Sequence, residues 1–141
     1  ENFKYTQLKG RVNYMCLRRW AHVRSSDNLS ESEARLLAKT LVWLQSTTTG
    51  DKSELNLGGK GIMAAWEWLS AQGAGECPMS RGPCFLRAAR ERAAAAHIVV
   101  VNHALLISDI VTGGTLIPTY DILIIDEAHH LEEEATKHLG F

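Results

Sequence analysis

The stretch DILIIDEAHHLEEE, residues 121–134, decides how the rest of the chain is interpreted. Four consecutive apolar residues, 122–125, are followed directly by two acids, Asp126 and Glu127. A continuous apolar run is typical of a parallel strand that is buried on both faces. In open α/β sheets, ligands bind beyond the carboxyl ends of such strands. The stretch therefore predicts a core strand that presents two carboxylates to a ligand.

A second apolar run, HIVVV at 97–101, leads into Asn102 and His103. The same reasoning places these two side chains at the functional edge of the sheet. The alternative is that Asn102 is a helix N-cap and His103 an ordinary surface residue. A short strand is also expected at 3–8. The fold class is therefore expected to be α/β, with a partial parallel sheet.

Helices are expected between and after these strands. At 30–45 a serine can cap the first turn, and Leu37, Leu41 and Leu44 fall on one predicted helix face. Further helices are expected at 62–71, 85–96, 102–110 and 131–140. Five aromatic side chains are expected to pack in a core: Trp20, Trp43, Trp66, Trp68 and Phe85.

The composition suits one domain with a real core, because 141 residues are 45% hydrophobic and 22% charged. No run approaches the roughly 20 apolar residues of a membrane span, and no leader pattern opens the chain, so a cytoplasmic location is expected. Basic residues gather in 1–24 and acids in 121–141. A basic segment could meet phosphates, although two solvated faces would give the same pattern. The start at Glu1 suggests a piece of a larger protein.

The chain has three cysteines, Cys16, Cys77 and Cys84. An odd count in a chain without a leader argues against a disulfide framework. Thiolates on irregular loops suit a soft metal or an iron–sulfur cluster. Because no C-x₂-C pair is present, incidental thiols remain an alternative.

Three strings, in this order, resemble the DinG-type iron–sulfur DNA helicases, XPD-like members of superfamily 2. They are KGRVNYMC at 9–16, CFLRAARERAAAAHIVVVNHALL at 84–106 and DILIIDEAHHLEE at 121–133. Together they extend over nearly the whole chain. The resemblance implies a partial helicase motor domain that is interrupted by a mainly helical domain of the iron–sulfur type.

The implied boundaries are a first motor segment at 1–15, the inserted domain at 16–96, and a second motor segment at 97–141. The implied function is that of an ATP-dependent DNA helicase that moves 5′-to-3′ on single-stranded DNA, unwinds duplexes and serves DNA repair. No G-x-x-x-x-G-K-[ST] phosphate loop occurs in the chain, so ATP hydrolysis is expected only of a longer parent protein.

Asp126 and Glu127 at the end of an apolar strand form a Walker B arrangement, which the resemblance identifies as a DEAH box. A carboxylate there holds Mg²⁺ beside the nucleotide phosphates, and its neighbour orients the attacking water. Asp126 is therefore expected to bind Mg²⁺ and Glu127 to position the water, both at the ATP site. His129 is expected to link hydrolysis to strand movement.

The resemblance also implies a 4Fe–4S cluster. Cys16 and Cys84 match the outer cysteines of the family pattern, and Cys77 matches one of the middle pair. The pattern has four cysteines and this chain has three, with Glu76 as the nearest candidate oxygen ligand. A cluster with another ligand, a three-iron cluster, zinc, and no metal all stay open.

The expected partners are ATP, single-stranded DNA and DNA junctions, with no membrane. The residues expected to contact nucleic acid are Lys9, Arg11, Asn13, Tyr14, Arg18, Arg87, Asn102 and His103. Cations and stacking rings together are typical of single-strand grooves. Two other functions remain possible: a nucleic-acid-binding module without a motor, and a structural metal-binding module.

Overall fold

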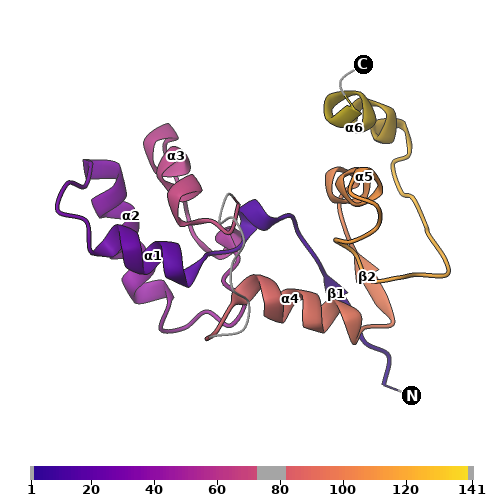
Figure 1. The fold of residues 1–141 in the computed structure, drawn as a ribbon, viewed down its shortest axis with the longest axis horizontal. Helices are drawn as coiled ribbons and strands as arrows, with labels where there is room; N and C mark the ends of the chain where they lie inside the picture. The colour runs from indigo at the N-terminus through magenta and orange to yellow at the C-terminus, as the bar shows by residue number, and fades with distance from the viewer. Residues whose placement is uncertain (1, 73–81, 140–141) are drawn as a thin grey trace. The chain divides into compact units, whose positions relative to one another are not determined.

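The structure is a computed structural model, which describes residues 2–72 and 82–139 (Figure 1). The chain divides into two compact units. The sheet unit comprises Glu1–Gly10 and Arg90–Phe141, and the helical unit comprises Arg11–Ala89. Within the described residues the chain forms α-helices α1 to α6 and one two-stranded parallel sheet, which confirms the α/β class. The assignment of the units to a motor domain and an insertion stays a prediction.

The sheet unit is built on two strands from opposite ends of the chain. Strand β1 (Tyr5–Gln7) pairs in parallel with β2 (Ile98–Val100), with Thr6 opposite Val99. The ladder continues past β1, because the Leu8 N–H donates to the Val100 carbonyl at 3.0 Å. Both segments were predicted as strands, and the β-branched residues of β2 favour that conformation.

Two helices accompany the sheet. Helix α5 (His103–Val111) and helix α6 (His129–Leu139) contact one another and lie side by side in Figure 1. Both were predicted from the sequence, to within a few residues at each end. Helix α5 buries Leu105, Leu106 and Ile107, which gives the sheet unit its apolar interior.

The prediction of a buried core strand at 121–126 is wrong for this structure. Residues 122–125 have no regular secondary structure, and Ile122 and Ile124 are 79% and 87% exposed. A buried parallel strand needs a neighbouring strand for its backbone hydrogen bonds and helices over both faces. Among the described residues, β1 and β2 pair only with each other, so this run has no strand partner. Strand β2 is itself about half exposed at Ile98 and Val100.

The helical unit contains α1 (Leu17–Arg24), α2 (Glu31–Trp43), α3 (Lys60–Leu69) and the first turns of α4 (Phe85–Ala94). Helix α3 contacts both α1 and α2, and Figure 1 shows the three gathered together. Their shared core is an apolar cluster: Met15, Leu36, Leu37, Trp43, Ala65, Trp66 and Leu69. No described helix has the length and apolar character needed to cross a bilayer.

Helix α2 begins with the capping box that its sequence predicts. The Ser30 side chain accepts a hydrogen bond from the Glu33 N–H, and a Glu33 carboxylate oxygen accepts one from the Ser30 N–H at 2.8 Å. The predicted buried face is partly wrong, because Leu41 is 46% exposed. The face that packs is rotated and consists of Leu36, Leu37, Thr40 and Trp43.

The aromatic predictions hold with one exception. Trp43 and Trp66 are buried and meet edge to face, and Trp20 and Phe85 pack against the core cluster. Trp68 is 61% exposed, so its predicted place in the core is wrong. It lies two residues after Trp66, about 200° around the helix, and therefore points away from the core.

Candidate functional site

The chain turns sharply between the apolar run and helix α6. Asp126 Oδ1 accepts a hydrogen bond from the Glu127 N–H at 2.9 Å. Glu127 has a φ of 49°, in the left-handed region that residues other than glycine rarely adopt. Its carbonyl accepts a hydrogen bond from the His130 N–H at 2.9 Å, which begins the helix. These contacts define the acidic loop, residues 126–130.

The side chains of the acidic loop are open to solvent. Glu127 Oε2 lies 3.4 Å from His129 Nδ1, and the two side chains are 65% and 68% exposed. An exposed pair of this kind contributes little to stability, roughly 0–1 kcal/mol. The loop is therefore free to approach a ligand, and its carboxylates supply the oxygen donors that hard cations prefer.

His103 joins the acidic loop to helix α5. Its Nε2 lies 2.9 Å from the backbone carbonyl oxygen of Asp126, within hydrogen-bond distance. The structure thus brings together the ends of the two apolar runs, as the sequence predicts. Asn102 lies beside it, where its side chain accepts a hydrogen bond from the Leu105 N–H at 2.9 Å. The helix-cap interpretation of Asn102 is therefore confirmed, while its role in nucleic-acid binding stays a prediction.

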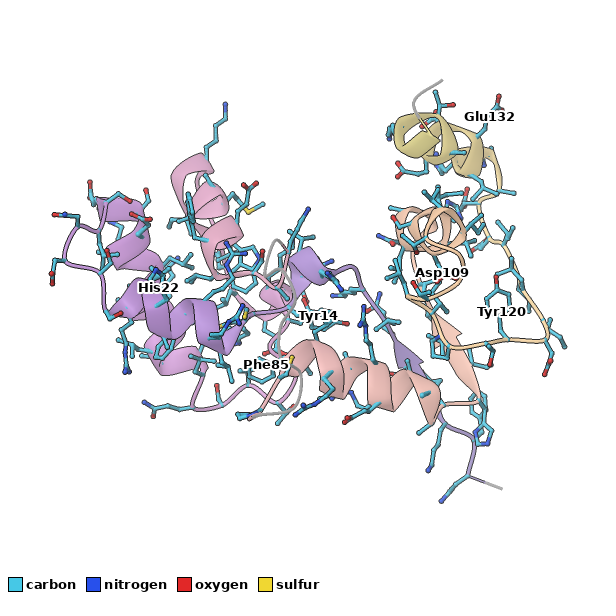
Figure 2. The ribbon with its side chains drawn as sticks, in the orientation of Figure 1. Tyr14, His22, Phe85, Asp109, Tyr120 and Glu132 are labelled. Atoms are coloured by element: carbon cyan, nitrogen blue, oxygen red, sulfur yellow. The ribbon has the colours of Figure 1, made fainter. Side chains whose placement is uncertain are left out.

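Asp109 is a residue that sequence reasoning missed. It is 4% exposed on α5, and its Oδ1 accepts hydrogen bonds from the Leu116 N–H at 2.7 Å and the Ile117 N–H at 3.0 Å. Figure 2 shows Asp109 on α5 and Tyr120 on the segment that follows the loop held by these two hydrogen bonds. The available signal was the single acid in the mostly apolar helix HALLISDIV. The contact holds the chain that leads into the acidic loop.

A cleft of about 760 Å³ lies within the sheet unit. Apolar side chains of β2 and of the exposed run contribute to its lining: Ile98, Val100, Ile122, Leu123 and Ile124. Its polar lining includes Asn102, His103 and Asp126. The cleft therefore connects the uncovered apolar run with the polar edge at which the acidic loop begins.

Two of the three cysteines lie in the helical unit as free, partly exposed thiols. Cys16 is the N-cap of α1 without a side-chain cap hydrogen bond, and Cys84 directly precedes α4. Cys77 and Glu76 lie outside the described residues. The described donors thus have the chemistry that a soft metal requires.

The residues predicted to contact nucleic acid fall in both units. Lys9 belongs to the sheet unit, as do Asn102 and His103, whereas Arg11 and Asn13 form a 3₁₀ helix (Arg11–Asn13) in the helical unit. In the helical unit Arg18 lies on α1 and is exposed. Their contacts with nucleic acid stay predictions.

Tyr14 and Arg87 have structural contacts of their own. Tyr14 is 3% exposed and forms a backbone bridge with Asp51, so the fold covers its ring. Arg87 Nη2 donates to the Gly82 carbonyl at 2.7 Å. Arg19 Nη1 similarly donates to the Ser70 carbonyl at 3.0 Å and to the Gln72 carbonyl. Arg19 and Arg87 thus use their guanidinium groups for hydrogen bonds to the backbone of their own unit.

No family model matches the chain, but curated proteins do. The chain is 35% identical over 136 residues to the 3′-5′ exonuclease DinG of Bacillus subtilis, covering 94% of this chain and 14% of that protein. It is 34% identical over 145 residues to the ATP-dependent DNA helicase YoaA of Haemophilus influenzae, covering 97% and 22%. It is 32% identical over 152 residues to the ATP-dependent helicase DinG of Mycobacterium tuberculosis, covering 94% and 22%. The chain thus spans between 14% and 22% of the length of these relatives.

Proposed function

Because the chain is homologous to one segment of the DinG-type helicases, we propose that it works as part of an ATP-dependent DNA helicase. The proposal is that the longer protein couples ATP hydrolysis to movement on single-stranded DNA and to duplex unwinding. The observation that carries it is the acidic loop of a helicase homologue, with Asp126 and Glu127 exposed beside His103. ATP hydrolysis, DNA binding and unwinding are properties proposed for the longer protein.

In this proposal Asp126 is the ligand for Mg²⁺. Its carboxylate is exposed at the polar edge of the cleft, and carboxylate oxygen is the donor that Mg²⁺ prefers. When bound, Mg²⁺ offsets the negative charge of the nucleotide phosphates. The hydrogen bond from the Glu127 N–H to Asp126 Oδ1 fixes the orientation of that carboxylate.

Glu127 is proposed to orient the water that attacks the terminal phosphate and to accept its proton. Its carboxylate lies next to His129, with Glu127 Oε2 3.4 Å from His129 Nδ1. His129 is thereby a positioning residue, because a change at its ring alters the orientation of Glu127. This contact is the proposed link between hydrolysis and strand movement.

The proposed path for DNA uses the cations and polar residues that the sequence singles out. His103 touches the Asp126 backbone and lies at the N-terminus of α5, next to Asn102. DNA held near this helix end would be coupled to the acidic loop through one hydrogen bond. Lys9 in the sheet unit, and Arg11, Arg18 and Arg87 in the helical unit, would contact the phosphates. Tyr14 would take part only if its ring became exposed.

The three cysteines are proposed to bind a metal group, a 4Fe–4S cluster that uses one ligand other than cysteine, with zinc as the alternative. Support comes from Cys16 and Cys84, which are free thiols in one unit and each precede a helix. The resemblance to the DinG-type helicases adds Cys77 as the third proposed ligand. A bound group would crosslink these chain segments and stabilise the helical unit.

Metal analysis tests the cysteine proposal directly. Iron, acid-labile sulfide and zinc should be measured on anaerobically purified protein, together with its visible spectrum. About four irons per chain would support the proposed cluster, and about three would indicate a three-iron form. Zinc without iron would support the structural metal-binding alternative. Protein that folds with no metal at all would contradict the proposal.

The helicase proposal is tested by unwinding assays on the full-length protein. Two partial duplexes of equal length should be compared, one with a single-stranded 5′ tail and one with a 3′ tail. The proposal predicts ATP-dependent unwinding of the 5′-tailed duplex only. Unwinding from the 3′ tail would overturn the proposed direction. DNA binding without ATP hydrolysis or unwinding would instead favour the nucleic-acid-binding module.

A further inference from the structure

Three side chains at the start of α6 place metal-binding atoms close together. The ligand atoms of Glu127, His129 and His130 all lie within 4.8 Å of one another. We propose that these three residues bind a divalent transition-metal ion of the Zn²⁺ class. The inference does not depend on the proposed motor activity, in which His130 has no role.

The donor set selects the class of metal. Zinc accepts imidazole nitrogen and carboxylate oxygen, and two histidines with one glutamate and a water form one of its established ligand sets. Mg²⁺ prefers an all-oxygen, octahedral shell and has little affinity for imidazole. The group therefore differs in chemistry from the Mg²⁺ ligand proposed at Asp126.

One pair of ligand atoms already has the spacing of a tetrahedral site. With bonds of about 2.0–2.1 Å, two ligands of a tetrahedral zinc ion lie roughly 3.3 Å apart. Glu127 Oε2 and His129 Nδ1 are already 3.4 Å apart. The His129 and His130 rings are in contact, with centroids 4.0 Å apart. The ring nitrogen of His130, now within 4.8 Å of the other two ligand atoms, has to move closer to them. A rotation of its side chain would provide this movement.

The surroundings permit that movement. The side chains of Glu127, His129 and His130 are 65%, 68% and 55% exposed, so no core packing has to break. The backbone holds the three together, because the His130 N–H donates to the Glu127 carbonyl at 2.9 Å. Glu133 Oε2 lies 3.9 Å from His130 Nδ1, beyond hydrogen-bond distance, and would have to move closer to orient that ring as an outer partner.

Charge in the first half of α6 also favours a cation. Glu132, Glu133 and Glu134 follow the site on the same helix, and Lys137 is paired with Glu134 at 2.7 Å. Zinc bound here would occupy Glu127 and His129. If the proposed motor function holds, zinc would therefore inhibit it by removing both side chains from the ATP site.

The test follows the NMR signals of each histidine side chain separately, in the 141-residue chain. Histidine side-chain ¹H–¹⁵N correlation spectra should be recorded during titration with ZnCl₂, in parallel with MgCl₂. We expect zinc to shift the ring nitrogens of His129 and His130 together, and magnesium to leave them unchanged. Zinc bound by the cysteines would leave the ring-nitrogen signals of His129 and His130 unshifted, so the two sites can be distinguished.

Two variants complete the experiment. His130→Asn should weaken zinc binding at His129 by at least about tenfold, since even the loss of an outer partner costs about 10- to 100-fold. His22→Asn is the matched control, because His22 is exposed on α1 and outside the group, and it should leave the affinity unchanged. Unshifted His129 and His130 signals at a severalfold excess of zinc would overturn the proposal. Equal affinity in wild type and His130→Asn would overturn it as well.

Discussion

At the scale of single residues, Asp109 shows how a buried carboxylate shapes a site that it does not enter. Its carboxylate accepts two backbone hydrogen bonds from the loop before the apolar run. An N–H group left without an acceptor in a buried position costs about 1–3 kcal/mol. Here the N–H groups of Leu116 and Ile117 share one acceptor, Asp109 Oδ1. Asp109 therefore fixes the path of the chain toward the acidic loop.

Asp109→Ala is expected to lower the free energy of unfolding by about 1–3 kcal/mol, because both N–H groups lose their acceptor. Urea unfolding measures this change, and hydrogen exchange at the amides of Leu116 and Ile117 should accelerate. Asp27→Ala is the control, because Asp27 is exposed in a loop. Equal stability of Asp109→Ala and wild type would contradict the structural role.

Glu54 gives a prediction for pH. Burial of its carboxyl acts to raise the pKa, but hydrogen bonds from Thr49, Thr47 and Trp43 outweigh it and lower the pKa of Glu54 below that of an ordinary glutamate. The Trp43 Nε1–H donates to Glu54 Oε2 at 2.8 Å. Because the folded-state pKa is lowered, the stabilisation is present above the unfolded value and lost as pH falls through the folded value.

Glu54→Gln is therefore expected to be less stable than wild type at neutral pH. The difference should shrink as the pH falls through the acidic range, where the wild-type carboxylate becomes protonated. Urea midpoints of both proteins across the acidic range measure this. A difference that stays constant down to about pH 3 would show that charge on Glu54 is not the source of the stabilisation.

Residue-scale sequence reasoning identified polar side chains at strand ends but not the contacts between them. Asp126 and His103 were both predicted at the edge of the sheet, and the structure joins them through the Asp126 backbone. Asp109 could not be assigned, because its partners are backbone amides whose position depends on how the loop returns. Trp68 was misassigned, because composition does not reveal which side of a helix faces the core.

At the scale of elements, local signals located most helices. The apolar spacing and the Ser30 capping box identified α2, and the alanine-rich run identified α4. Helix α1 was missed, since basic residues make up half of its sequence LRRWAHVR, counting His22, and interrupt the apolar positions. Leu17, Trp20 and Val23 recur at three-residue spacing and pack against the core cluster, which was the available signal.

The Ser30 cap is expected to contribute measurably to the stability of the helical unit. Ser30→Ala removes the acceptor for the Glu33 N–H and should cost about 1 kcal/mol, within a usual range of about 0.5–2 kcal/mol. Ser26→Ala, in the exposed loop before the cap, is the control. Thermal and urea unfolding measure both changes. If the two variants lose equal stability, the cap is not responsible.

Strands were harder to predict than helices, because a strand depends on partners that are distant in the sequence. The run at 122–125 has every local feature of a core strand and yet lies exposed without a strand partner. Strand β2 was predicted on the same grounds and does form, because β1 supplies its backbone partner. Local pattern thus predicts the tendency to form a strand, and pairing decides whether it does.

At the scale of the whole molecule, the uncovered apolar run has a consequence for association. Exposed apolar patches and unpaired strands are sites at which chains aggregate. We expect the isolated chain to self-associate as its concentration rises, in sedimentation velocity measurements. Ile124→Lys, at an 87% exposed position, should reduce association. Val42→Lys, at a 74% exposed position in the helical unit, should not. If both variants associate equally, the apolar run at 122–125 is not the surface through which the chains associate.

The central claim is that the acidic loop belongs to an ATP-driven DNA motor, and Glu127 tests it most directly. The measurement is DNA-stimulated ATP hydrolysis by the full-length protein, comparing wild type, Glu127→Gln and the control Glu67→Gln, an exposed glutamate on α3. General-base catalysis contributes about 10²–10⁴-fold, so Glu127→Gln should lower kcat at least about a hundredfold while DNA binding persists. Glu67→Gln should hydrolyse ATP like wild type. Undiminished hydrolysis by Glu127→Gln would contradict the account.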